Sequence, residues 1–161
     1  MEQTPISLFE ASDYNISLNQ HWYRGGFPHA LLAETDVEFH QWMDNFIHTY
    51  IEKEMEYLFD VSFTSSVLRN FWIMLANNNG SLFNAEQYAN SLGVSVTTVK
   101  RYLDYFEAAY LISRLQPWFI NAGKRLVKSQ KVYVRDSGVL HRLCRIHSYQ
   151  SLFEHLIVGA S

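Results

Sequence analysis

Apolar residues between positions 35 and 62 recur every three or four residues, which is the spacing of one face of an α-helix. Thr35 or Asp36 can cap its start, because both side chains accept hydrogen bonds from free backbone N–H groups. The pattern predicts an amphipathic helix of about six turns. Its stripe is wide and aromatic, so we expect it to pack against the following domain or another chain. The stripe consists of Val37, Phe39, Trp42, Met43, Phe46, Ile47, Tyr50, Ile51, Met55 and Leu58.

Three further helices are predicted downstream, each with a capping residue. Thr64 or Ser65 can cap the first, Asn84 the second and Ser95 the third. An Asn-rich stretch ending in glycine terminates the first of them, because Asn and Gly tolerate left-handed backbone angles. Gly93 lies between the last two helices and permits a sharp turn.

The last two helices have the spacing of a helix-turn-helix. Ala89 supplies a small residue where the helices cross, Gly93 the turn, and Val99 a β-branched residue early in the second helix. Residues 111–120 and 131–135 are rich in strand formers and are separated by an Asn-Ala-Gly turn. These features predict a mainly α fold with a small β-wing: a winged helix-turn-helix preceded by a long amphipathic helix.

The chain divides into four predicted segments. The N-terminal residues show no periodicity, and Trp22–Pro28 contains a Gly-Gly and a Phe-Pro pair that are typical of a turn. Short helices are expected near 137–146 and 152–158. The predicted segments are an N-terminal arm at 1–34, the long helix at 35–62, the winged-helix domain at 63–136 and a C-terminal stub at 137–161.

Composition narrows the class of protein. With 161 residues, 48% of them hydrophobic and 18% charged, the chain can bury a core. Its single cysteine excludes a disulfide framework and a CxxC-type zinc site. No apolar run approaches the roughly 18 residues of a membrane span, and no basic n-region precedes an apolar h-region at the N-terminus. We therefore expect a cytoplasmic protein that does not contact membranes.

Charge is distributed unevenly. Residues 1–94 hold three basic residues against twelve acidic ones, whereas residues 95–145 hold ten basic residues against three acidic ones. Such asymmetry is typical of a surface that faces phosphates. The alternative is a chance clustering of ordinary surface lysines and arginines.

The winged-helix prediction indicates which residues would contact duplex DNA. The exposed face of the second motif helix would enter the major groove, and the wing would lie along the phosphates. Arg101 is the one residue on that helix able to contact guanine in a bidentate manner. The alternatives are that this face packs against protein or has no partner. The candidate DNA-binding residues are Ser95, Thr97, Thr98, Lys100, Arg101 and Tyr105 on the helix, and Lys124, Arg125 and Lys128 in the wing.

The sequence gives little indication of a metal site, a catalytic thiol or a nucleotide site. The seven histidines offer no pair at metal-ligand spacing, so no metal site is expected. Cys144 is interpreted as a buried structural thiol, since no catalytic partner is indicated. Gly123-Lys124 lacks the other residues of a phosphate-binding loop. We therefore predict no catalytic residue, no metal and no cofactor in this chain.

Four short stretches of the sequence, taken together, resemble those of a known family. The resemblance is to the C-terminal half, called domain of unknown function 4143, of a prokaryotic family of predicted AAA+ ATPases, and it covers residues 18–161. Gln130 replaces a usual Pro, and Lys53-Glu54 a usual Arg-Asp. The strings are Trp22–Pro28, Thr49–Glu54, Asn121–Ser129 and Lys131–Gly138.

The resemblance implies a P-loop ATPase module before this region and a nuclease-like α/β region after it. On this interpretation the chain is an excised piece or a truncated reading frame, residues 137–161 are the stub of the nuclease-like region, and ATP and Mg belong only to the missing module. The expected function is non-catalytic binding of duplex DNA. The alternatives are a protein-interaction module that docks the ATPase, self-association through the aromatic helix, or a truncated fragment of an enzyme.

Overall fold

The computed structural model describes residues 16–59, 64–117 and 129–159, which are mainly helical with a small antiparallel sheet. Within these residues no helix is long and apolar enough to span a membrane. The helices are α1 (Leu18–Arg24), α2 (Pro28–Leu31), α3 (Asp36–Thr49), η1 (Tyr50–Glu54), α4 (Met55–Phe59), α5 (Ser65–Asn77), α6 (Ala85–Leu92), α7 (Val96–Ala108), α8 (Ser137–Leu143), α9 (Tyr149–Phe153) and η2 (Leu156–Gly159), and the strands are β1 (Ile112–Leu115) and β2 (Lys131–Val134).

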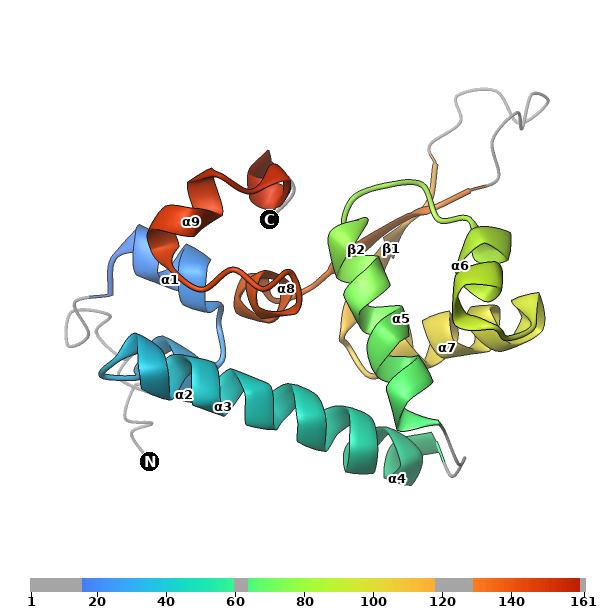
Figure 1. Cartoon of the computed structure of the whole chain (residues 1–161), viewed down its shortest axis with the longest axis horizontal. Helices are drawn as coiled ribbons and strands as arrows, with labels where there is room; N and C mark the ends of the chain where they lie inside the picture. Colours follow the sequence, from blue (N-terminus) through green and yellow to red (C-terminus); the bar gives the residue numbers. More distant parts are fainter. Residues whose placement is uncertain (1–15, 60–63, 118–128, 160–161) are drawn as a thin grey trace, which may run out of the picture.

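Two groups of elements lie along one long helix (Figure 1). α1, α2 and α9 gather near the start of α3, whereas α5, α6, α7 and the sheet lie toward α4. α8 lies between the groups and packs against α1, α3 and α5. The long helix formed by α3, η1 and α4 therefore runs beside both groups of elements (Figure 1).

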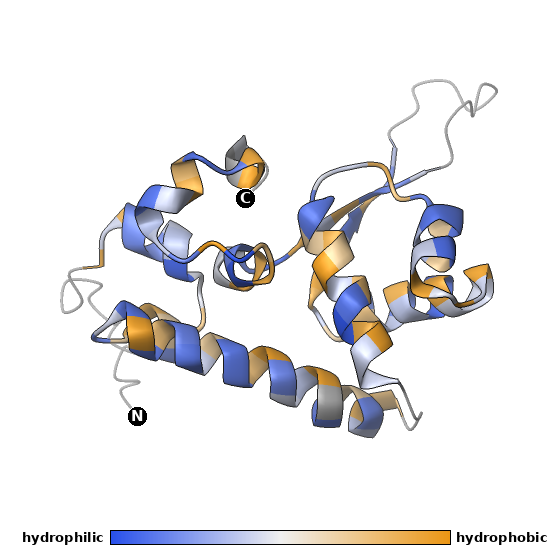
Figure 2. Ribbon diagram, in the orientation of Figure 1, coloured by the Kyte–Doolittle hydropathy of each residue, from blue (hydrophilic) through white to orange (hydrophobic). Residues whose placement is uncertain are grey.

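The predicted long helix is confirmed and is continuous from α3 through η1 to α4. Thr35 caps it in a capping box: its hydroxyl accepts from the Glu38 N–H, and the Glu38 carboxylate accepts from the Thr35 N–H. Met43 and Ile47 are buried. Hydrophilic and hydrophobic positions alternate along the helix in Figure 2, as expected of an amphipathic helix.

The aromatic stripe is covered from two sides. Its first aromatic ring, that of Phe39, is buried, and those of Trp42, Phe46 and Tyr50 are half-buried. Phe27 packs on Phe46 with ring centroids 4.6 Å apart, and it also contacts Trp42. The Tyr50 hydroxyl donates a hydrogen bond to a backbone carbonyl at the end of α7, 3.3 Å away. The four aromatic side chains of the stripe are therefore covered, at least in part, within this single chain, whereas Val37 and Leu58 near its two ends are exposed.

The three helices predicted downstream are also confirmed. The Asn84 side chain accepts from two N–H groups at the start of α6, and Ser95 caps α7. Gly93 ends α6 with a φ of 67°, a left-handed angle that glycine adopts without steric cost. Ala89 and Val99 are buried. α6 and α7 therefore pack closely across a short turn.

The sheet consists of β1 and β2 in antiparallel register, with Ile112 opposite Val134 and Leu115 opposite Lys131. A short segment before α6 also pairs with Lys131, through an isolated bridge at Leu82. The N–H groups of Gly80 and Phe83 donate to backbone carbonyls beside it, each over 2.8 Å. β2 therefore has a partner on both edges.

The sequence predicts an arm without helices or strands before residue 35. This prediction is wrong for residues 18–31, which contain the two short helices α1 and α2. α1 begins after Ser17, whose hydroxyl accepts from the Gln20 N–H. Tyr23 is buried among other aromatic rings. Helices this short are marginal alone and depend on tertiary packing, which periodicity does not reveal.

The C-terminal elements differ slightly from the prediction. The helix expected near 137–146 is confirmed as α8, which ends at Leu143. The helix expected near 152–158 is instead α9, which begins earlier because Ser148 and Ser151 form a capping box. A short 3₁₀ turn follows it as η2.

One carboxylate joins α1 to α8. Asp136 accepts the Val139 N–H on one oxygen and the Gly26 N–H on the other, each over 2.8 Å. A Cβ at Gly25 would overlap the Asp136 carboxylate, and one at Gly138 would overlap the Arg24 carbonyl oxygen. The two glycine-containing strings noted in the sequence are therefore a packing junction.

Buried His141 lies at the same junction. Its Nδ1 donates to the Tyr23 carbonyl oxygen over 3.0 Å. Burial lowers the pKa of His141, so the imidazole is held neutral.

We expect Gly138→Ala to lower the free energy of unfolding by at least about 3 kcal/mol, because the added methyl meets backbone that has little freedom to move. Gly93→Ala is the matched control: it has open space and should cost only about 1 kcal/mol from its left-handed angle. Urea denaturation measures both. An equal loss of unfolding free energy in the two variants would contradict the close contact between Gly138 and the Arg24 backbone.

We also expect stability to fall as the pH drops below about 6.5, since the unfolded chain then takes up a proton that buried His141 resists. His141→Asn should flatten this dependence, and His29→Gln, at an exposed position, should not. Thermal unfolding between pH 5 and 8 is the measurement. An unchanged pH profile in His141→Asn would count against this assignment.

Candidate functional site

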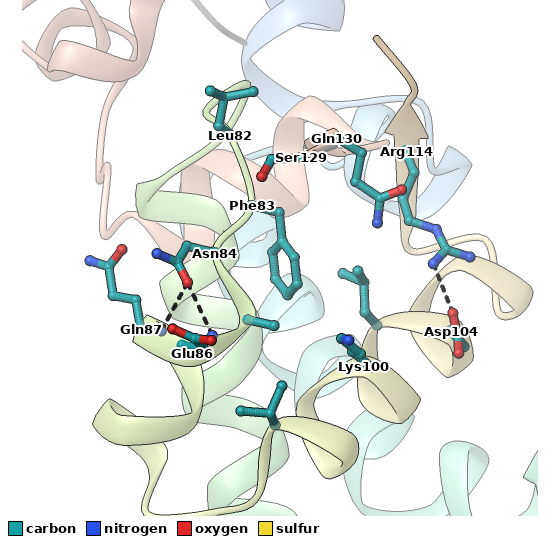
Figure 3. A pocket seen from close by; sticks show the side chains of 13 residues that line it. Leu82, Phe83, Asn84, Glu86, Gln87, Lys100, Asp104, Arg114, Ser129 and Gln130 are labelled. Atoms are coloured by element: carbon teal, nitrogen blue, oxygen red, sulfur yellow. Dashed lines mark hydrogen bonds and ion pairs between the residues drawn. The ribbon is translucent and has the colours of Figure 1, made fainter. Parts of the chain in front are cut away.

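A groove of about 920 Å³ lies between α6, α7 and the sheet (Figure 3). It is open on one side, and its walls come from the segment before α6, the first turns of α6, α7, β1 and the residues before β2. The lining residues are Leu82, Phe83, Asn84, Ala85, Glu86, Gln87, Val96, Lys100, Leu103, Asp104, Arg114, Ser129 and Gln130.

The wall from α6 is held rigidly. The Asn84 side chain accepts the N–H groups of Glu86 and Gln87 over 3.1 and 3.3 Å. Phe83 stacks on Tyr88 with ring centroids 4.9 Å apart. Tyr88 is buried, which raises its pKa to about 12. Figure 3 shows the Phe83 ring within the groove, where it forms an apolar surface.

The predicted contact residues on α7 fall into two groups. Ser95, Thr97, Lys100 and Arg101 are exposed. Lys100 lines the groove, whereas Arg101 lies outside it. These four residues form the outer face of α7, by which we mean the exposed side of its N-terminal half.

Thr98 and Tyr105 are only partly exposed, and each has a structural contact, which Thr98 shares with Ser95. The Thr98 hydroxyl lies 2.9 Å from the Ser95 hydroxyl and takes part in the N-terminal cap. Tyr105 is half-buried and packs on Phe59 with ring centroids 4.4 Å apart. The periodicity of α7 places Tyr105 near its exposed side, but the end of α4 covers it.

The three predicted wing residues, Lys124, Arg125 and Lys128, lie outside the described residues. Ser129 and Gln130, which follow them, line the groove (Figure 3). The continuous basic surface expected from α7 and the wing stays a prediction.

Arg114 is a site residue that sequence reasoning missed. It donates to Asp104 over 2.7 Å and to Glu107 over 2.6 Å. These hydrogen bonds, above all those from Arg114 to Glu107, lower the pKa of Glu107 and raise that of Arg114. Two carboxylates three residues apart on one helix could have indicated a cation between them.

The charged residues in the groove balance. Its lining has two positively charged residues, Lys100 and Arg114, and two negatively charged ones, Glu86 and Asp104. Arg101 is exposed on α7 and adds a positive charge outside the groove.

Cys144 is buried, as predicted. Burial raises its pKa to about 11, so the thiol stays protonated at neutral pH and is a poor nucleophile.

Residues 15–150 match the model of a family described as Domain of unknown function (DUF8612). The chain belongs to this family. Two curated relatives are Uncharacterized protein Rv2008c of Mycobacterium tuberculosis and Uncharacterized protein Mb2031c of Mycobacterium bovis. Each is 39% identical over 140 residues, which cover 87% of this chain and 32% of the relative. The chain thus spans about a third of their length. No solved structure matches it significantly.

The match to DUF8612 corrects the resemblance inferred from the sequence strings. Assignment of the chain to domain of unknown function 4143 of AAA+ ATPases is wrong. The physical reason lies in the strings themselves. Trp22–Pro28 and Lys131–Gly138 meet at the α1–α8 junction, where their glycines and aspartate serve packing. These two strings therefore mark a contact within the fold.

We expect Tyr105→Ala to lower the free energy of unfolding of this DUF8612 chain by about 2 kcal/mol, because it removes a half-buried ring from Phe59. Lys100→Ala and Arg101→Ala should each change it by less than about 0.5 kcal/mol, since both side chains are exposed. Chemical denaturation compares the three. A similar loss of stability in all three would mean that the outer face of α7 is also part of the core.

Proposed function

We propose that this chain binds duplex DNA as a winged-helix module, with α7 as the recognition helix. The order of elements supports this: α5, a short pairing segment at residues 80–83, α6, α7, β1 and β2 follow one another along the chain. The short segment pairs with one edge of β2, and β1 pairs with the other. A winged helix combines its helices and strands in this order around a helix-turn-helix.

The exposure of the outer face of α7 carries the proposal. The inner face of the helix is buried through Val99, Leu103 and Phe106. Its C-terminal half is occupied: Asp104 and Glu107 bind Arg114, and Tyr105 contacts Phe59. Its N-terminal half is left exposed, and the N-terminal half of a recognition helix is the part that reaches base edges.

The side chains on this face suit both kinds of DNA contact. The hydroxyls of Ser95 and Thr97 can donate to phosphate oxygens. Lys100 supplies a positive charge, and Arg101 can bind guanine through two parallel hydrogen bonds. Arg114 binds Asp104 beside them, which reduces its repulsion of phosphates, although Glu107 shares the same guanidinium group. No catalytic role is proposed for any of these residues.

A protein partner is the second candidate function. The groove beside α7 has balanced charges and an apolar surface formed by Phe83, Val96 and Leu103. These features favour a segment of another protein over a phosphate backbone inside the groove. Under this alternative, the outer face of α7 would form only the rim of a protein interface.

The test is fluorescence anisotropy with a library of short duplexes over a range of salt concentrations. Arg101→Ala should weaken binding by about 1 to 3 kcal/mol at the preferred sequence if Arg101 reads a base. Replacing Lys124, Arg125 and Lys128 together should weaken binding to all sequences. The slope of the logarithm of the binding constant against the logarithm of salt concentration should become shallower by about one for each phosphate that these side chains had neutralised. Lys53→Ala, an exposed lysine on the long helix, is the matched control.

Two outcomes would contradict DNA binding. One is the absence of binding by the unaltered chain at low ionic strength. The other is an equal effect of Lys53→Ala and Arg101→Ala, which would indicate attraction to net charge alone. If Val96→Glu in the groove abolished capture of a partner protein while Arg101→Ala did not, the protein-binding alternative would be favoured.

A further inference from the structure

A second cavity, of about 400 Å³, lies between α3, α5 and the end of α8. It shares no lining residue with the groove beside α7. Arg69 reaches it from α5, Arg142 from α8, and Arg145 and His147 from the segment after α8. We call these four residues the arginine cluster.

Positive charge exceeds negative charge in this cavity. Its three guanidinium groups face a single lining carboxylate, that of Asp44. Arg142 binds Asp44 through two hydrogen bonds, of 2.7 and 2.5 Å. Among the described residues, neither Arg69 nor Arg145 has an ion-pair partner. Arg142 above all, and Arg69 by its charge, lower the pKa of Asp44. One carboxylate offsets only one of the three guanidinium charges, so two positive charges remain available to a ligand.

The same ion pair orients the neighbouring imidazole. Arg142 Nη1 lies 3.2 Å from His147 Nδ1. A guanidinium group can only donate, so Nδ1 accepts this hydrogen bond. Asp44, Arg142 and His147 thus form a fixed chain of polar groups along one wall.

The backbone of Arg145 is unusual. Its φ is 59°, in the left-handed region that glycine normally occupies after a helix. The Arg145 N–H donates to the Arg142 carbonyl, and the Ile146 N–H donates to the His141 carbonyl, which closes the end of α8. An arginine in this position is disfavoured relative to glycine, which points to a use for its side chain.

We propose that the arginine cluster binds the phosphate group of a small phosphorylated molecule. Planar guanidinium groups match phosphate oxygens in pairs, and two unpaired guanidinium charges balance a phosphate monoester dianion. Ile47, Ile73 and Leu143 form an aliphatic wall beside them that suits an apolar part of the ligand. The volume lies within the roughly 300 to 1,000 Å³ of small-molecule sites. This site is independent of DNA binding by α7.

The test is calorimetric titration of the full chain with phenyl phosphate, inorganic phosphate and phenol. Phenyl phosphate should bind more tightly than inorganic phosphate, because its ring can pack on the aliphatic wall, and phenol should not bind. Arg145→Gly should weaken phenyl phosphate binding by about tenfold or more, because it removes charged hydrogen bonds. This variant should keep its fold, since glycine favours the left-handed angle.

Arg69→Ala, at an exposed position on α5, is a second variant with the same expected reduction in affinity. Arg101→Ala removes the same charge from α7 and should leave phenyl phosphate binding unchanged. The proposal would be overturned by the absence of saturable binding at millimolar phenyl phosphate, or by an equal reduction in Arg101→Ala. It would also be overturned if Arg145→Gly lowered affinity for duplex DNA and not for phenyl phosphate, which would assign the cluster to the DNA backbone.

Discussion

The fold depends on the Asp136 carboxylate, which accepts backbone N–H groups from both ends of the described chain. Its bond to Gly26 joins residues 110 positions apart, and its bond to Val139 caps α8. Hydrogen bonds to a carboxylate are stronger than those between neutral groups. Beside this contact, Arg24 binds Asp36 over 2.9 Å in the first turn of α3. One small cluster therefore fixes the starts of both α8 and the long helix.

The sheet lies close to this junction along the chain. β2 ends two residues before Asp136, and the Val134 N–H at its end donates to the Asn79 side chain over 2.7 Å. β2 pairs with β1, and β1 carries Arg114, which binds the C-terminal half of α7. The long helix holds α7 from the other side through Phe59. Held at its C-terminal half by both contacts, α7 presents its N-terminal half outward. α5, the end of α8 and the segment after it form the arginine cluster at a separate cavity.

The junction also explains why short strings were a poor guide to the family of the chain. A close backbone approach needs glycine, and an N-cap that bridges two segments needs a small carboxylate. Unrelated activities can share such a contact, because it stabilises a fold without touching a ligand. The match to DUF8612, together with relatives three times as long, leaves function to be argued from the exposed side chains.

Sequence alone determined the features that depend on local spacing. The long helix, the α6–α7 pair, the caps at Thr35 and Ser95, the turn at Gly93 and the exposed face of α7 all follow from interactions within a few residues. Tertiary structure decided the rest. α1 is too short to be stable alone, Tyr105 is covered by a distant helix, and the arginine cluster gathers residues more than 70 positions apart. Periodicity reports which side of a helix is apolar, but only packing decides which distant element meets it.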